Sequence, residues 1–506
     1  MRKFLVCSFL FFSSICLFAD SIEIDWRKAK WPSVNYTKTP VNGGASIYHL
    51  KEDESGITSM NFYFRTGAMT VPEDLYETYS AAASFYIEGG IGKRSYEELN
   101  KFLTQEVITL KVDLSSKHFV VTTQFMKEDF DVVLGLLEDV FFRPNFSSKS
   151  FKVWKKNKKD FFSGFVDGAS SEERSSFMRL VAHKHLLGKE HFFSNSLIRM
   201  NHKSTDRLKL SKIKSSSKYF INKSDLNVFL SGDFSEINVD KIKKLINKIP
   251  EKDPTVLKWL PNRPRNKSNN SDNKTDVILV TKKGMTQTDI HFWQLLPKIG
   301  RLNELEKAQQ LLLSEIYYST LGGIGESRFS KALRIDTGIA YFPWSQFNLD
   351  YLYPNTNVGL WKMGFQAQNN RVFEGLQVMY STWKKIVDEG VSKGELDKSR
   401  ISLINSNLTR ETTVFLKMSY ISSLISEGKL PTSNPWLKYI LLLDQQKDVS
   451  SMNKYIKHMI DFPRSSLVVL MGDLDQQFVQ KLNKSDQFRL ISEIKFKDLI
   501  KEIEKK

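Results

Sequence analysis

An arginine and a tyrosine, Arg334 and Tyr341, stand seven residues apart in the run LGGIGESRFSKALRIDTGIAYF. A guanidinium is a fixed cation that can hold carbonyl oxygens through several N–H donors. A phenol can donate a hydrogen bond to an oxygen that becomes negative during a reaction. No obvious nucleophile or metal ligand accompanies them, so the pair is suited to act on a neighbouring molecule. By residue type alone, a solvated helix arginine and a core tyrosine are the simpler explanation of the two positions.

The elements that position this pair can be read from the same run. The segment SRFSKALRID has the pattern of an amphipathic helix, and Gly338 fits the left-handed residue that commonly ends a helix. We expect this turn to lead Tyr341 into a strand. The Gly-Gly step before the helix is expected to make only a turn, and Arg328 fits a surface charge as well as a functional one.

A second group that could do chemistry is the histidine cluster AHKHLLGKEHF, which contains His183, His185, Glu190 and His191. A zinc site is one interpretation. However, residues 183 and 185 lie on different sides of a helix, whereas two ligands on one face need a spacing of three or four. We therefore do not predict a metal site here.

The first 19 residues have the pattern of a secretory signal peptide. Arg2 and Lys3 precede the apolar run Phe4 to Phe18, and Ala19 offers a small residue for cleavage. The only two cysteines lie inside this segment, so the mature chain would have no disulfide and no cysteine-based metal site. No later segment has the length of apolar sequence that spans a bilayer, so we expect no transmembrane anchor. These features predict an exported protein, periplasmic if the cell has two membranes.

The chain is strongly basic, with a formal net charge of +17. Such a charge can attract nucleic acid or an anionic surface. The lysines are nevertheless spread along the chain, and no motif of aromatic and basic residues for nucleic acid accompanies them. We interpret most of them as a solvated surface and expect no nucleic-acid partner.

The polar run NRPRNKSNNSDNKT, residues 262–275, is the clearest linker. It separates two parts, 30–250 and 276–500, that share an order of strand and helix patterns. Each part has a helix that ends at Gly-Gly, and each closes with an apolar run followed by Gly-Asp, in DLNVFLSGDF and SSLVVLMGDL. This order predicts a duplicated α+β domain, with helices packed on one face of a largely antiparallel sheet.

The ordered motifs FRTGAM, EGGIGKRSYEEL, FRPNF, HLLGKEHF, SGDF, QTDI and LGGIGESRFSKALRIDTGIAY resemble the M16 metallopeptidases, the family of pitrilysin and the mitochondrial processing peptidases. The resemblance covers nearly the whole mature chain. It implies two homologous α+β domains, two pairs of which form a clamshell around a peptide. It also implies a His-x-x-Glu-His zinc motif on the first domain, where two histidines on one helical face hold zinc and the glutamate activates water.

The zinc motif is missing from this chain. Counting back from GGIGKRS, the motif positions fall on Ala81, Ser84 and Phe85, which can neither bind zinc nor act as a general base. The third ligand of the family is a glutamate further along the chain, on the helix that reads SFKVWKKNKKDFFSGF here and offers only Asp160. We therefore predict no catalytic zinc in this chain.

The resemblance also gives Arg334 and Tyr341 a role. In active members, an arginine and a tyrosine of the second domain reach across the chamber to the substrate, and the two residues here have the family's spacing and Gly-x-Ala-Tyr context. The chain then resembles the zinc-less subunit of a two-subunit peptidase. It would be inactive alone and would serve a partner that bears His-x-x-Glu-His and holds the zinc. A peptide or an unfolded protein would be the substrate.

Three alternatives stay open at this point. One is a homodimer instead of the heterodimer. Another is a structural or assembly protein on a peptidase-like scaffold, because fold alone does not fix function. A weaker alternative is a basic protein that binds anionic polymers of the cell envelope.

Overall fold

A computed structural model describes residues 36–51, 56–115, 117–167, 170–188, 194, 202–224, 226–253, 274–296, 309, 312–322, 327–348, 360–410, 422, 445–459 and 466–505. The predicted signal peptide and residues 262–273 of the predicted linker lie outside these ranges. Within them, no helix is long and apolar enough to cross a membrane.

The first half of the chain builds a six-stranded sheet in the order β1-β2-β6-β3-β5-β4. Only the pair β2 and β6 is parallel. The strands are β1 (Thr37–Pro40), β2 (Ser46–Leu50), β3 (Ile57–Phe64), β4 (Thr109–Leu114), β5 (Phe119–Met126) and β6 (Asn227–Ser231).

The second half builds another six-stranded sheet in the order β12-β7-β11-β8-β10-β9. Here β7 runs parallel to β11 and to β12, and the other pairs are antiparallel. The strands are β7 (Thr275–Thr281), β8 (Gln287–Leu295), β9 (Trp344–Asn348), β10 (Leu360–Gln368), β11 (Ser466–Gly472) and β12 (Phe488–Lys495).

Five strands of each sheet repeat one topology. The spatial order 2-6-3-5-4 of the first half becomes 7-11-8-10-9 in the second, with the same sequence of strands along the chain. Only the sixth strand differs, because β1 precedes its unit and β12 follows its unit. The two halves therefore have the same α+β architecture, as the repeated sequence pattern predicts.

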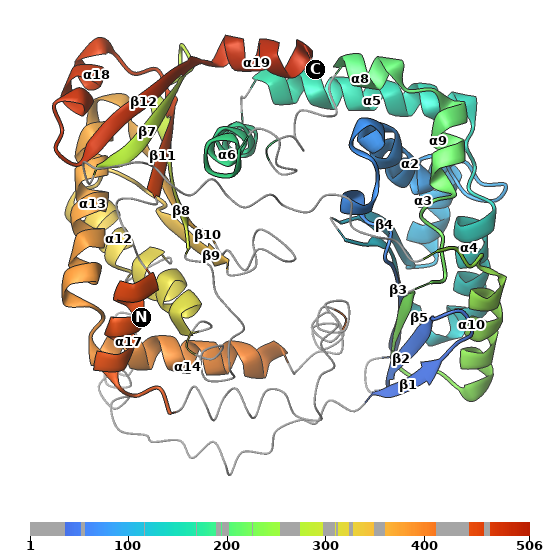
Figure 1. The fold of residues 1–506 in the computed structure, drawn as a ribbon. Helices are drawn as coiled ribbons and strands as arrows, with labels where there is room; N and C mark the ends of the chain where they lie inside the picture. The colour runs from blue at the N-terminus through green and yellow to red at the C-terminus, as the bar shows by residue number, and fades with distance from the viewer. Residues whose placement is uncertain are drawn as a thin grey trace, which may run out of the picture.

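Helices cover the outer face of each sheet, and the two sheets stand on opposite sides of the molecule (Figure 1). In the first half, apolar residues at helical spacing in α4, such as Val133 and Leu137, join a core with Phe62 of β3. The helices of this half are α2 (Tyr76–Glu88), α3 (Tyr96–Gln105), α4 (Phe130–Phe142), α5 (Ser148–Asp167), α6 (Ser171–Leu187), α8 (His202–Arg207), α9 (Leu210–Ser217) and α10 (Glu236–Lys248), with short 3₁₀ turns η2 (Ala68–Thr70), η3 (Glu73–Leu75) and η4 (Lys127–Asp129).

The second half has a core of its own between its sheet and α13, to which Trp361, Leu376 and Trp383 belong. Its helices are α12 (Arg328–Ser330), α13 (Val372–Glu389), α14 (Lys393–Arg410), α17 (Val449–Met459), α18 (Gln476–Asn483) and α19 (Phe496–Lys505), with the π-helical segments η5 (Ile316–Gly322) and η6 (Lys331–Asp336) and the 3₁₀ turn η7 (Asn369–Arg371).

Helix α6 joins the two halves. It belongs to the first half by sequence, and its first turn is fixed by a capping box between Ser170 and Glu173. Its apolar residues, among them Phe177 and Met178, pack on the inner face of the second sheet together with α19. In Figure 1, α6 lies beside β8 and β11, so the second sheet is covered on both faces.

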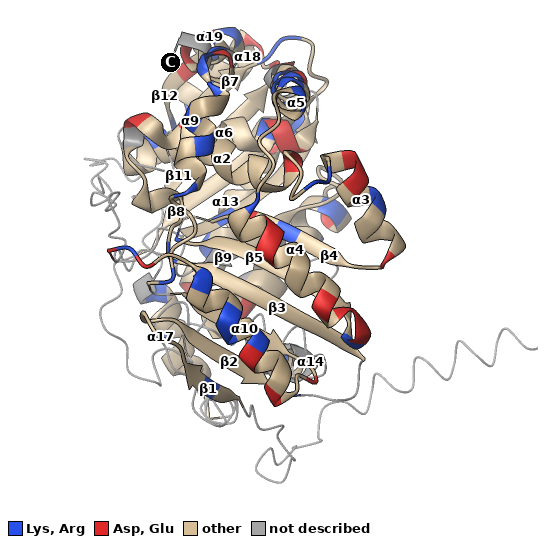
Figure 2. Cartoon of the chain, turned by 90° about the vertical axis from the view of Figure 1, so that its right-hand side faces the viewer, with Lys and Arg blue, Asp and Glu red and all other residues tan. Residues whose placement is uncertain are grey.

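Charged side chains are mixed over the outer surface. Figure 2 shows basic and acidic residues interleaved on α3 and α10, acidic residues on α4, and a denser group of basic residues on α5. Lys241 and Lys248 of α10 form ion pairs with Asp131 and Glu138 of α4. This pairing fits the interpretation of many lysines as a solvated surface.

Candidate functional site

The three positions of the missing zinc motif are built into the packing of α2. Ala81 and Phe85 are buried, and the Phe85 ring contacts the rings of Phe151 and Trp154 on α5. Burying a phenylalanine side chain of this kind stabilises the fold by roughly 2–3 kcal/mol. These two positions are thus part of the hydrophobic core.

The third position, Ser84, belongs to a polar network that bridges α2 and α5. Its hydroxyl donates to Oε1 of Glu88 at 2.6 Å and accepts from Nε1 of Trp154 at 3.2 Å. The ammonium of Lys158 lies 3.4 Å from the same Glu88 oxygen. Helix α5 therefore faces the motif positions with an indole and an ammonium, while Asp160 is exposed. A cation beside these positions opposes metal binding, so the residues present do not fit a zinc ion.

The histidine cluster separates into unrelated environments. His183 is buried with its ring against Trp293 at 5.7 Å, whereas Nε2 of His185 lies 4.0 Å from Asp276. Burial lowers the pKa of His185, and the nearby Asp276 partly offsets this shift. Glu190 and His191 lie outside the described residues. Within the described part of the chain, no group of three potential metal ligands is found.

Arg334 and Tyr341 come together where the chain passes from η6 to β9. Arg334 projects from η6, and its guanidinium carbon lies 4.5 Å from the centre of the Tyr341 ring. This is a cation–π contact, which fixes the two side chains relative to each other. Tyr341 is 78% exposed. The pair is therefore neither buried in the core nor separated.

The expectation that Tyr341 lies on a strand is wrong. Tyr341 sits in a bend, and β9 begins three residues later at Trp344. Pro343 explains the delay, because proline has no N–H for the ladder and also restricts the residue before it. Tyr341 is thus carried by a loop on the edge of the sheet.

Several contacts fix this loop. Gly338 has φ of +61°, so the predicted left-handed turn after the arginine-bearing helix is present. Both Ile339 and Ala340 donate from their backbone N–H to the carbonyl of Leu333. The Arg371 guanidinium donates to the carbonyls of Thr337 and Gly338, and it is held in turn by Glu374.

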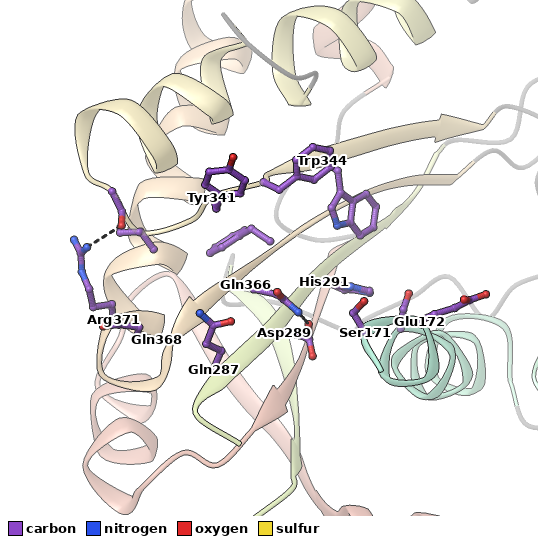
Figure 3. Close-up of a pocket in the computed structure, with 15 residues that line it drawn as sticks. Ser171, Glu172, Gln287, Asp289, His291, Tyr341, Trp344, Gln366, Gln368 and Arg371 are labelled. Carbon is purple, nitrogen blue, oxygen red and sulfur yellow. Dashed lines mark hydrogen bonds between the residues drawn. The ribbon is translucent and has the colours of Figure 1, made fainter. Parts of the chain in front are cut away.

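A cavity of about 670 Å³ opens beside Tyr341, between the inner face of the second sheet and the first turn of α6. Figure 3 shows Tyr341 and Trp344 on one side and Gln287, Asp289, His291 and Gln366 on the floor. Ser171 and Glu172 of α6 form the opposite wall.

The floor contains a buried ion pair and a neutral histidine. Asp289 pairs with Arg174 of α6 and accepts from Nε2 of Gln366 at 2.6 Å. Burial, and to a lesser extent the charge of Lys362, lower the pKa of His291 to about 3, so its imidazole is uncharged at neutral pH. Nδ1 of His291 has no hydrogen-bond partner among the described residues.

Sequence reasoning did not find Asp289, His291 or Arg371. The register of β8 could have indicated the first two, because polar residues alternate with Ile290 and Phe292 along that strand. Arg371 has no such local signal. By contrast, Arg328 is a structural residue, because it forms a two-pronged ion pair with Glu395 and also binds the Gly390 carbonyl.

Two α+β halves of one topology, with no fitting metal ligands at the motif positions of α2, are the arrangement expected from a resemblance to the M16 family without its zinc motif. A family profile described as the peptidase M16 inactive domain matches residues 207–403. The predicted resemblance to the M16 family is therefore confirmed.

Individual relatives agree with this class. A Helicobacter pylori protein named non-peptidase homolog YmxG is 22% identical over 437 residues, which cover 84% of this chain and 90% of that protein. A structure described as the peptidase M16 inactive domain from Pseudomonas fluorescens has a TM-score of 0.67 at 16% identity, over 87% of this chain and 98% of that chain. The periplasmic protease PqqL of Escherichia coli has a TM-score of 0.67 at 14% identity, over 89% of this chain but only 47% of PqqL. This chain thus spans about half the length of PqqL.

Proposed function

We propose that this chain is the zinc-less subunit of a two-subunit M16 metallopeptidase. It would bind the substrate peptide and present Arg334 and Tyr341 to the zinc site of a partner that carries His-x-x-Glu-His. The observation that carries the proposal is the contrast between two sites. The zinc positions are filled by internal packing, whereas Arg334 on η6 and Tyr341 on the following loop are exposed, and that loop is held by several hydrogen bonds.

The chemistry of the pair suits this role. The Arg334 guanidinium can hold a peptide carbonyl through its N–H donors. The Tyr341 hydroxyl can donate to the carbonyl oxygen as that oxygen becomes negative, which stabilises the transition state more than the bound substrate. The partner's metal would supply the activated water. The loop contacts of Arg371 and Gly338 reduce the entropy lost when the hydroxyl is positioned.

A heterodimer is supported by size. This chain corresponds to about half of PqqL, so a second half of similar size would complete the same enclosure. A homodimer would contain no zinc motif, because both copies carry Ala81, Ser84 and Phe85. The predicted signal peptide of residues 1–19 supports a location of the proposed complex outside the cytoplasm, in the periplasm if the cell has two membranes.

A structural or assembly role is the second candidate. It is favoured by the complete network of Ser84, Glu88, Trp154 and Lys158, which leaves no trace of a metal site. The H. pylori relative is also named a non-peptidase homolog. On this alternative, the Arg334–Tyr341 pair would contribute only to the local structure.

The test is a tagged pull-down of the mature protein from its native cells, with the eluate assayed for zinc and for hydrolysis of unstructured peptides. The proposal predicts an equimolar partner of similar size with a His-x-x-Glu-His motif, bound zinc and chelator-sensitive activity. Elution alone, or with unrelated envelope proteins and without zinc or activity, would favour the structural role.

A further inference from the structure

The cavity beside Tyr341 is a separate feature from the contact between Arg334 and Tyr341. At about 670 Å³, it falls in the range of ligand-binding pockets, and it could hold a side chain together with its flanking backbone. The cation–π contact itself involves the loop and η6, and Arg334 does not line the cavity. The Arg334–Tyr341 contact therefore does not account for the cavity.

Two of the charged groups that line the cavity are already neutralised within the protein, and the third, the Glu172 carboxylate on the α6 wall, is exposed to water. Asp289 is paired with Arg174, and Arg371 is paired with Glu374. His291 is neutral, and Glu172 is exposed on the first turn of α6. A charged group buried in this cavity would find no fixed partner of opposite sign on the floor, which is unfavourable. The occupant of the floor is therefore uncharged.

One wall of the cavity is aromatic. Tyr341 is 78% exposed, Phe342 is 51% exposed, and Trp344 is partly buried next to His291. Two adjacent aromatic side chains left open to water add nothing to the core, and exposed apolar surface of this kind often marks an interaction site. Flat rings prefer other rings in offset or edge-to-face contact. The wall thus favours an aromatic occupant.

The floor supplies hydrogen-bonding groups without charge. The side-chain amides of Gln287 on β8 and Gln368 on β10 line the cavity and have no partner among the described residues. A side-chain amide has both donors and an acceptor, which matches the N–H and C=O of a peptide backbone. The cavity therefore combines an aromatic wall with an amide floor.

We propose that this cavity is a subsite for an uncharged aromatic side chain of the bound peptide. The ring lies against Phe342 and Trp344, and the neighbouring backbone binds Gln368. This inference rests on the proposed function, since it takes the ligand to be a peptide. An oligosaccharide is another uncharged ligand that stacks on aromatic rings, and it is the competing occupant in the test.

The test measures the affinity of the mature chain for fluorescent nine-residue peptides that differ only at the central position, which is Tyr, Phe, Ser, Lys or Asp. We expect the Tyr and Phe peptides to bind about three- to tenfold more tightly than the Ser peptide, as ring–ring contacts provide. The Lys and Asp peptides should bind no better than the Ser peptide. Phe342→Ala should remove most of this preference, and Gln368→Ala should weaken all five peptides by a similar factor.

The matched control is Tyr318→Ala, which removes another exposed aromatic ring of the same half, 60% exposed and outside the cavity. It should leave the preference unchanged. Equal affinity for all five peptides would overturn the subsite but leave peptide binding intact. The same holds if Phe342→Ala and Tyr318→Ala reduce the preference for aromatic peptides equally. If no peptide binds at all, the proposed function fails as well. If oligomers of N-acetylglucosamine bind in a Phe342-dependent manner and peptides do not, the cavity is a carbohydrate site and the proposal is wrong.

Discussion

At the scale of single residues, the positions of the missing zinc motif are packed into the fold, whereas the pair proposed to be functional is exposed. Ser84 and Phe85 are fixed by α5, whereas Arg334 and Tyr341 are exposed and fixed mainly by each other. Exposed polar side chains in a defined geometry point to interaction more than to stability.

His291 should make the fold sensitive to acid. Because its folded pKa of about 3 lies below the ordinary value of 6.5, its contribution to stability is present above pH 6.5 and is lost as the pH falls toward 3. The full effect is on the order of 5 kcal/mol, at about 1.4 kcal/mol for each pH unit. Urea unfolding at pH 7, 5.5 and 4.5 should show a shallower decline for His291→Phe than for the natural protein. An equal decline in both would show that His291 is protonated freely in the folded state.

At the scale of elements, the loop between η6 and β9 decides where the Tyr341 hydroxyl lies. Arg371 reaches this loop from the turn before α13 and binds two of its carbonyls. Its role is to position the loop, because it lies outside the cation–π pair. The loop therefore links the packing of α13 to the proposed chemistry.

Arg371→Ala should lower kcat of the complex with its zinc-bearing partner by about ten- to hundredfold, since small misplacements of a catalytic group are costly. Peptide affinity should change little, and the effect should not add fully to that of Tyr341→Phe. The control is Arg143→Ala, which breaks a comparable exposed pair with Asp139 on α4 of the other half. Equal losses in both variants would indicate a general effect on stability.

The α2–α5 contact should resist restoration of a zinc site. The triple change Ala81→His, Ser84→Glu and Phe85→His recreates the motif on α2, but α5 still presents Trp154 and Lys158. We expect no stoichiometric zinc and a loss of about 3–5 kcal/mol from the Phe85 change alone. Metal analysis after dialysis and thermal unfolding measure the two effects. One tightly bound zinc with peptidase activity in the isolated chain would contradict this account.

Local features of this fold are encoded in short stretches of the sequence, whereas contacts between distant residues are not. Motif order and patterns of period 2 and 3.6 predicted the repeated α+β halves, and Gly338 predicted the turn before Tyr341. Pro343 was the overlooked signal that keeps Tyr341 off the strand. The pairing of Trp154 with Ser84 and that of Arg174 with Asp289 join residues 70 and 115 positions apart. No local pattern encodes such contacts, so the cavity could not be predicted.

At the scale of the whole molecule, α6 makes the two halves one unit. Its Arg174 and Lys184 form ion pairs with Asp289 and Glu502, which both belong to the second half. A further contact joins Tyr63 of β3 to Ser422 at 3.2 Å. The site beside Tyr341 therefore depends on a helix from the first half.

Arg174→Ala should destabilise the protein by about 3 kcal/mol, because it leaves the buried Asp289 without its cation. Lys184→Ala is the matched control on the same helix. Its partner Glu502 is largely exposed, so the loss should stay below about 1 kcal/mol. Denaturant unfolding gives the free energy of unfolding of both variants. Similar decreases in the two would show that the buried Arg174–Asp289 pair stabilises the protein no more than the exposed pair does.

The most direct test of the central claim is the kinetics of Tyr341→Phe in the complex with the zinc-bearing subunit that co-purifies with the natural chain. The account predicts that kcat falls by about 10²–10³-fold, the usual effect of removing one donor to a developing oxyanion. The affinity for an inert peptide should stay within about twofold. An unchanged kcat with the same partner would contradict the claim and leave the Arg334–Tyr341 pair as part of a structural scaffold.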